Sequence, residues 1–300
     1  GLITRTREAQ VRPCRLKAEP KEITLAIGGR EGLQVHGDEE LLITAVRNFI
    51  DNAIAYSPER TRVVVCKRLL PRVRAEPAAI AREALVLARA RHASLPELRR
   101  VGTDAHGPFL LETRALGTSV RALVDGWRAR GSTVPPRLVA HLAAAASQAL
   151  AELHELTDDR GPLGFVHGDL GPDHVLLGPL GEVRFVDLGA ARFAGMDPAL
   201  HTDDRGTLPF AAPEVARGEA PPDRAADVYA LAATLLHLAT GGPLCAAQGD
   251  AAMLLSIGER GLSPSLCDGA AGLASSARDA LRRAIALDPA SRLRDARELA

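Results

Sequence analysis

Aromatic side chains are rare in this 300-residue sequence, which contains six Phe, two Tyr and one Trp. Only four cysteines occur, Cys14, Cys66, Cys245 and Cys267, and no two of them form a C-x-x-C pair. This scatter argues against a zinc site or a disulfide framework and suits a reducing compartment. Neither sign of charge is in excess, with 37 basic and 37 acidic residues, so no global field favours nucleic acid or an anionic membrane.

Long hydrophobic runs are also missing. The longest, near residues 228–240, contains His237 and is too short to cross a bilayer, so we expect a buried helix there. No basic segment followed by an apolar one opens the chain as a signal peptide would. These absences predict a cytoplasmic protein with no membrane span and no nucleic-acid partner, and the alanine-rich composition suggests a bacterial source.

The pattern of apolar residues divides the chain into a strand-rich part and a larger helical part. A β-branched run at 62–67 predicts a buried strand, and residues 78–91 are rich in helix formers. Residues 101–111, interrupted by a turn sequence, predict a hairpin. From Pro136 onward apolar residues recur at three- and four-residue steps, which predicts helices, with one short hairpin around residues 178–181.

Three polar residues around that short hairpin form a signature of phosphoryl transfer. Asp169 lies on a tight loop, His174 follows five residues later, and Asp187 comes after the hairpin. Nucleotide phosphates need a divalent cation to mask their oxygens, and the attacking hydroxyl needs a carboxylate to orient it and accept its proton. We therefore expect Asp169 to receive the hydroxyl and Asp187 to hold the metal, with His174 as a second ligand.

The stretch from Val166 to Leu177, followed by Val186 to Gly189, resembles the catalytic and metal-binding loops of eukaryotic-type protein kinases, which are widespread in bacteria. That family reads H-R-D-L-x-x-x-N and then D-F-G. Further motifs follow in the family's order: G-T-L-P-F-A-A-P-E at 206–214, D-V-Y-A-L at 227–231 and D-P-A-S-R at 288–292. The resemblance implies an α+β, bilobal protein-kinase-like fold over residues 62–300.

The resemblance also implies where ATP would bind. The small lobe would comprise residues 62–113 and the large lobe residues 114–300. In active kinases a buried Lys–Glu pair aims its ammonium at the phosphates, and Lys67 with Glu83 would supply it. Glu112 and Arg114 fall in the segment whose backbone meets adenine.

His174 stands where the family has the Asn that binds a second metal ion. Magnesium prefers oxygen ligands, whereas imidazole suits manganese, zinc and similar ions. The expected cofactors are therefore ATP and Mg²⁺, with Mn²⁺ as the alternative metal.

Five more residues have structural roles in the resemblance. Thr207 would contact the catalytic acid, and Glu214 would pair with Arg292. His167 would join an apolar column that couples the lobes, and Asp227 would begin the long buried helix of the large lobe.

The chain also departs from the family pattern. No G-x-G-x-x-G-x-V hairpin precedes Lys67, so the small lobe is expected to be incomplete. Gly168 replaces the Arg that helps to receive a phosphorylated activation loop, which argues that switching by phosphorylation is weak. Gly171 replaces a Lys that binds the transferred phosphate.

Residues 1–61 resemble part of a different ATP-binding fold. Asn48, Asn52 and Ser57-Pro58 match the N-x-x-x-N-A…S-P pattern of the N-box helix in sensor histidine kinase ATPase domains. There the second Asn helps to hold the nucleotide's metal, a role that would fall to Asn52. The rest of that nucleotide site does not follow, so we favour an amphipathic helix that packs on the small lobe.

The sequence therefore predicts a serine/threonine protein kinase that acts in signal transduction on an unidentified protein substrate. Gly206-Thr207 before A-P-E favours Ser/Thr over Tyr. The first alternative is a pseudokinase, a nucleotide-binding or regulatory module that the missing glycine hairpin favours. A small-molecule phosphotransferase of the aminoglycoside type shares H-G-D-L but lacks the A-P-E and D-V-Y-A-L motifs. An ATPase centred on Asn52 is favoured least.

Overall fold

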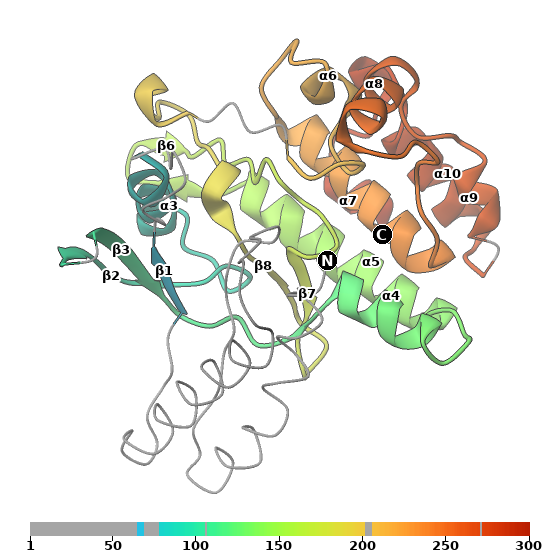
Figure 1. Ribbon diagram of the computed structural model, residues 1–300, viewed down its shortest axis with the longest axis horizontal. Helices are drawn as coiled ribbons and strands as arrows, with labels where there is room; N and C mark the ends of the chain where they lie inside the picture. The colour runs from blue at the N-terminus through green and yellow to red at the C-terminus, as the bar shows by residue number, and fades with distance from the viewer. Residues whose placement is uncertain (1–64, 69–77, 106, 202–205, 271) are drawn as a thin grey trace, which may run out of the picture. The chain divides into compact units, whose positions relative to one another are not determined.

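The computed structural model describes residues 65–68, 78–105, 107–201, 206–270 and 272–300 (Figure 1). The interpretation of Asn48 and Asn52 as part of an N-box lies outside these residues. The chain divides into two compact units, the first made of residues 1–74 and 98–114 and the second of residues 75–97 and 115–300.

The described part of the first unit is a three-stranded antiparallel sheet. Its strands are β1 (Val65–Arg68), β2 (Leu98–Asp104) and β3 (Gly107–Glu112), in the order β1-β3-β2. The strand at 62–67 and the hairpin at 101–111 that the sequence predicts are both found, within a few residues of the expected bounds. Gly102 allows this pairing, because a Cβ there would lie 2.7 Å from the ring of Phe109 on β3.

Two long helices form the core of the second unit. They are α5 (Pro136–His154) and α7 (Arg224–Thr240), and α4 (Val120–Arg128) lies beside α7 (Figure 1). Pro136 at the first helical position suits the start of α5 because it has no N–H to leave unsatisfied. Thirteen of the seventeen residues of α7 are buried, as the predicted buried helix requires. Asp223 caps the start of α7 by accepting a hydrogen bond from Ala226 N at 2.9 Å.

A small sheet carries the loops with the polar signature. Its strands are β4 (Thr118–Ser119), β7 (Val175–Leu177) and β8 (Val183–Phe185), in the order β4-β7-β8. The β7–β8 hairpin is the one that the sequence predicts, and β8 packs against α5. Residues 166–174 lead into β7 and residues 186–190 leave β8, so the hairpin brings the two loops together.

Shorter elements complete the second unit. They are the strands β5 (Thr157–Asp158) and β6 (Gly161–Pro162), the 3-10 turns η2 (Leu188–Ala190), η3 (Pro198–Leu200), η4 (Pro289–Ser291) and η5 (Ala296–Leu299), and the helices α6 (Pro213–Ala216), α8 (Asp250–Arg260), α9 (Leu266–Gly269) and α10 (Ser275–Ala284). None of the helices in the described ranges is both long and apolar enough to span a membrane.

Helix α3 (Ala78–Arg89) belongs by its contacts to the second unit. Its buried Arg82 donates from Nη1 to Gly189 O at 2.7 Å and from Nε to Leu200 O. Near the end of the helix, Arg89 Nε donates to Asp158 Oδ2 at 2.9 Å. Arg82 thus fixes α3 to the segment that follows β8, and Arg89 fixes it to β5.

Candidate active site

A buried carboxylate holds the loop that precedes β7. Asp227, near the start of α7, is 1% exposed and accepts three hydrogen bonds. His167 N donates to its Oδ2 at 2.8 Å, Gly168 N to its Oδ1 at 2.9 Å, and His154 Nε2 to its Oδ2 at 3.0 Å. A buried carboxylate needs several donors to offset its lost hydration, and these three fix the backbone of the loop at 167–168. Burial holds the pKa of His167 below its ordinary value, so this ring is neutral.

Gly168 has a backbone conformation that side chains disfavour. Its φ is +78°, and a Cβ would lie 2.7 Å from the carbonyl oxygen of Ala190. The glycine that stands in place of the family's Arg is therefore required by this path of the chain. The close approach also brings the loop against η2, the turn that follows Asp187.

Asp169 points toward the segment that begins at Gly206. Its Oδ1 accepts a hydrogen bond from Thr207 N at 2.7 Å, and its side chain is 16% exposed. The sequence predicts a contact between Thr207 and the catalytic acid, and the structure makes one through the Thr207 main chain. The carboxylate is thus fixed by one oxygen, and its other oxygen, Oδ2, lies 3.4 Å from His174 Nδ1.

His174 lies between the two predicted functional acids. Its Nδ1 donates to Asp169 O at 2.7 Å, and its Nε2 lies 3.7 Å from Asp187 Oδ2. Burial alone would lower the pKa of His174, but the carboxylates of Asp169 and Asp187 outweigh it and raise the pKa. Because Nδ1 carries the donated proton, the neutral ring turns the lone pair of Nε2 toward Asp187.

Asp187 adopts a left-handed backbone conformation, with φ 64° and ψ 79°, and its side chain is 49% exposed. The carboxylate caps the turn η2, where Gly189 N approaches Oδ1 at 3.4 Å. Val186 N, one residue earlier, donates to His174 O at 3.0 Å. The turn is held from its other side by Arg82, which binds Gly189 O. Asp187 therefore lies on a backbone that is fixed on both sides.

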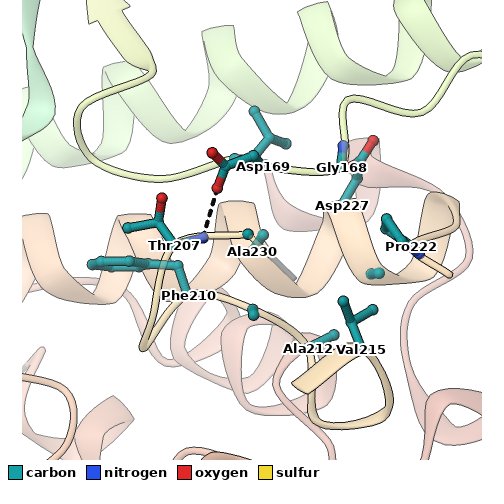
Figure 2. A pocket seen from close by; sticks show the side chains of 13 residues that line it. Gly168, Asp169, Thr207, Phe210, Ala212, Val215, Pro222, Asp227 and Ala230 are labelled. Carbon is teal, nitrogen blue, oxygen red and sulfur yellow. Dashed lines mark hydrogen bonds between the residues drawn. The ribbon is translucent and has the colours of Figure 1, made fainter. Parts of the chain in front are cut away.

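A pocket lies between this loop and the segment 206–215. Figure 2 shows Asp169 and Thr207 at its edge, joined by their hydrogen bond. Most lining residues are small or apolar: Gly168, Asp169, Leu170, Gly206, Thr207, Phe210, Ala211, Ala212, Val215, Pro222, Ala226, Asp227 and Ala230. The loop that carries Asp169 is thus packed against the segment 206–215 and the start of α7 through small and apolar groups.

The far end of this segment is anchored by the ion pair expected from the sequence. Arg292 Nη1 and Nη2 donate to Glu214 Oε1 and Oε2 at 2.6 and 2.7 Å. The guanidinium also donates from Nε to Ala286 O at 2.8 Å and lies over the ring of Tyr229 at 4.9 Å. This bidentate, fully hydrogen-bonded geometry is what a buried ion pair needs in order to offset its desolvation.

In the first unit, Lys67 on β1 has a carboxylate partner on β3. Its Nζ lies 3.3 Å from Glu112 Oε1, and the two side chains are 26% and 5% exposed. Glu83, the partner that the resemblance implies, is buried on α3. The pairing of Lys67 with Glu83 stays a prediction. Arg114 lies half-buried just beyond the end of β3.

The role of Arg82 escaped the reasoning from sequence. It carries no sequence signal, because its acceptors are main-chain carbonyls far along the chain. Lys67, which the sequence does single out, carries a further signal: the chain has 34 arginines but only three lysines, Lys17, Lys21 and Lys67. A lysine in so arginine-rich a chain indicates a position where a compact ammonium is needed.

The donors near the hairpin fit a divalent cation in part. Asp187 offers a hard carboxylate, and His174 offers Nε2 on the same side while its Nδ1–H binds a backbone carbonyl, the arrangement typical of metal-binding histidines. Among the described residues no group of three or more His, Cys, Asp or Glu could hold a metal ion. Two protein ligands suit magnesium or manganese bound together with phosphate oxygens and water.

Comparison with known proteins gives a family match over most of the chain. A family model described as protein kinase domain matches residues 53–299, and so begins within the predicted N-terminal segment 1–61.

Three curated relatives illustrate the range of similarity. Tyrosine-protein kinase MasK of Myxococcus xanthus is 27% identical over 208 residues, which cover 68% of this chain and 32% of that protein. Serine/threonine-protein kinase PknK of Mycobacterium tuberculosis is 36% identical over 138 residues, 43% of this chain and 12% of the relative. Mitogen-activated protein kinase kinase kinase 17 of Arabidopsis thaliana is 36% identical over 80 residues, 27% of this chain and 21% of the relative. The chain thus spans less than a third of the length of each.

Proposed function

The chain belongs to the protein kinase family, and we propose that it transfers the γ-phosphate of ATP to serine or threonine hydroxyls of a protein. The observation that carries this proposal is the position of Asp169. One carboxylate oxygen is fixed by Thr207 N, and the other lies 3.4 Å from His174 Nδ1, the ring that also approaches Asp187. A carboxylate fixed in this way can orient a hydroxyl and accept its proton.

The remaining roles follow from the same geometry. Asp187 and His174 would hold the divalent cation, whose chemistry is to neutralise charge on the phosphates. Lys67 would bind the phosphates through its ammonium, with Glu83 as the partner in the family arrangement. Glu112 and Arg114 lie at the end of β3, where the family's backbone meets adenine.

Preference for Ser/Thr rests on two observations. Gly206-Thr207 precedes A-P-E, a pattern that favours Ser/Thr over Tyr. The relatives named serine/threonine kinase or mitogen-activated protein kinase kinase kinase share 36% identity with this chain, although MasK is named a tyrosine kinase.

The proposal is tested by Asp169→Asn, with transfer of radiolabelled γ-phosphate to a generic basic protein as the measurement. We expect kcat to fall by a factor of about 10² to 10⁴, because the amide cannot accept the proton. Asp159→Asn, on an exposed turn outside the site, is the matched control and should keep full activity. Equal transfer by the wild type and Asp169→Asn would disprove the role of Asp169.

The metal role of His174 is tested by His174→Asn. If its Nε2 binds the cation, activity of the wild type with Mn²⁺ relative to Mg²⁺ should exceed that of the variant by about three- to tenfold, because imidazole favours the softer ion. The measurement is the ratio of kcat/KM in the two metals. An unchanged ratio would exclude His174 as a ligand.

A nucleotide-binding or regulatory module without transfer activity is the second candidate. The feature that favours it is the missing glycine-rich hairpin. The sequence contains no G-x-G-x-x-G before Lys67 that would cover the phosphates. ATP-dependent thermal stabilisation without phosphate transfer, in a chain that remains folded, would support this candidate over the first.

A further inference from the structure

The ion pair of Arg121 with Asp173 joins α4 to the loop that carries Asp169. Arg121 Nε donates to both carboxylate oxygens of Asp173, at 2.9 Å to Oδ1 and 2.7 Å to Oδ2. The main chain of the same residue donates as well, from Arg121 N to Pro172 O at 2.8 Å. Helix α4 contacts β7 and α7, so the whole joint belongs to the second unit (Figure 1). Arg121 is therefore fixed to this loop through both its main chain and its side chain.

The contact with Asp173 uses only one of the three guanidinium nitrogens. Within the described ranges, neither Nη1 nor Nη2 of Arg121 donates a hydrogen bond, and the side chain is 36% exposed. A guanidinium has five N–H donors, so four remain for an anion that approaches from solvent. The Asp173 side chain is 22% exposed, and both of its oxygens already accept the Nε–H of Arg121. A peptide at this surface would therefore meet N–H donors beside a carboxylate whose charge is already matched.

The pair lies close along the chain to the candidate catalytic acid. Asp173 follows Asp169 by four residues, which span at most about 14 Å when fully extended. The turn here is tighter than that, because His174 N and Val175 N both donate to Gly171 O. An extended peptide advances about 3.3 Å per residue. The pair therefore falls within about four residues of a hydroxyl that is held at Asp169.

His237, on α7, relates Arg121 to the segment 206–215 as well. The ring of His237 lies edge-on to the ring of Phe210, with the centroids 5.9 Å apart. Burial is the main cause that lowers the pKa of His237, and the positive charge of Arg121 acts in the same direction. The guanidinium is thus close enough to act on a ring that supports this segment. Arg121 is near both chain segments that meet at Asp169 and Thr207.

We propose that Arg121 is a specificity-determining residue that selects substrates with an acidic side chain within about four residues of the Ser or Thr acceptor. This inference rests on the proposed function, because it assigns the acceptor hydroxyl to Asp169. A carboxylate of the substrate would bind the outer nitrogens of Arg121, whose planar fork suits it, and the same guanidinium would repel a basic side chain. Because the pair is partly exposed, the effect is a preference, and a basic protein is still a substrate, only a poorer one.

The test uses serine peptides that differ at one position. Each peptide has one Ser with four neutral residues on either side, and each neutral position is replaced in turn by Glu, Gln or Lys. The measurements are kcat/KM for transfer from ATP and, without ATP, the affinity for the fluorescently labelled peptide by anisotropy. They are made on the wild type, Arg121→Gln and Arg282→Gln. Arg282 is the matched control, because it lies on α10, is 39% exposed and also pairs with Asp side chains.

In the wild type we expect one position at which Glu exceeds Gln by about three- to fivefold and Lys falls below Gln, in both measurements. In Arg121→Gln the preference for Glu should disappear and Lys should become the preferred residue, because Asp173 is then uncovered. The change should appear in KM, with kcat constant within about twofold, because Arg121 does not touch the reacting atoms. A purely structural role would instead lower kcat/KM for all peptides alike. Arg282→Gln should keep the wild-type preference.

Two results would overturn the proposal. One is a wild type that prefers Lys over Glu at every position, and the other is an equal preference for Glu in the wild type and Arg121→Gln. Far-UV circular dichroism checks that the variants fold. If Arg121→Gln does not fold, Arg121→Lys takes its place. A single ammonium cannot hold Asp173 and a substrate carboxylate in the same fork, so the preference should fall below about twofold, and an unchanged preference would overturn the proposal.

The two measurements also separate this inference from the proposed function. A preference for Glu that depends on Arg121 in binding, without transfer to any peptide, would support the recognition role and disprove the transfer activity. Transfer that depends on Asp169 but shows no charge preference would support the proposed function and overturn this inference. Absence of both binding and transfer would overturn both.

Discussion

The two units hold their polar groups in different ways. In the second unit, main-chain N–H groups fix the acids: Asp227 accepts two of them, and Asp169 accepts one from Thr207. In the first unit, Lys67 is held in part by an ion pair between side chains, the one with Glu112. Main-chain donors are set by the fold and lose little freedom on binding, whereas two long side chains must be ordered to meet. We therefore expect the acids to be rigid and the lysine to be adjustable.

The largest effect should come from breaking the support of the second unit at Asp227. Asp227→Asn places an NH₂ group where one oxygen now accepts from His167 N and His154 Nε2. We expect a loss of about 3–5 kcal/mol in the free energy of unfolding, measured with urea, because buried donors lose their acceptor. Glu259→Gln, exposed on α8, is the control and should change stability by less than about 0.5 kcal/mol. A loss below about 1 kcal/mol for Asp227→Asn would show that the support is not rigid.

Gly168 gives a matched pair of substitutions in the same unit. Gly168→Ala must adopt φ +78° and place a Cβ against Ala190 O, so we expect a loss of about 2–3 kcal/mol in the free energy of unfolding. Gly126→Ala lies on exposed α4, where a Cβ meets nothing within 4 Å, and should stabilise the protein by about 0.5–1 kcal/mol. Urea unfolding of both variants gives the comparison. Similar effects of the two would contradict a special backbone path at residue 168.

The smallest effect is expected in the first unit. Lys67→Met removes the ammonium that contacts Glu112, but the Lys67 side chain is 26% exposed, so water already screens the pair. We expect a loss of about 1 kcal/mol in the free energy of unfolding at pH 7. A loss as large as that of Asp227→Asn would remove the contrast between the units.

Much of the fold could be predicted from the sequence, because its signals are local. Periodicity or turn residues predict the hairpin at 178–181, the long helix from Pro136 and the buried helix near residues 228–240. The contact of Glu214 with Arg292 was predictable because both residues belong to recognisable motifs. Short spacing also places Asp169 and His174 on one loop.

Contacts that depend on register or on main-chain path were not predictable. To predict that Lys67 lies near Glu112, one must know that Val65 is opposite Glu112 in the sheet. Neither composition nor spacing encodes that register. The need for glycine at residue 168 arises from the position of Ala190 O, a group that every amino acid carries. The sequence shows which side chains are present, whereas these features depend on where backbone atoms meet.

Arg82 shows how such a contact tolerates mutation. Its two described acceptors, Gly189 O and Leu200 O, are peptide carbonyls. Replacing the side chain of Leu200 by another would leave that acceptor in position. The residues that supply these carbonyls can therefore be substituted while α3 stays joined to η2 and η3. Arg82 itself cannot be replaced in the same way. Lysine has a single side-chain nitrogen and could not reach both carbonyl oxygens as the guanidinium does.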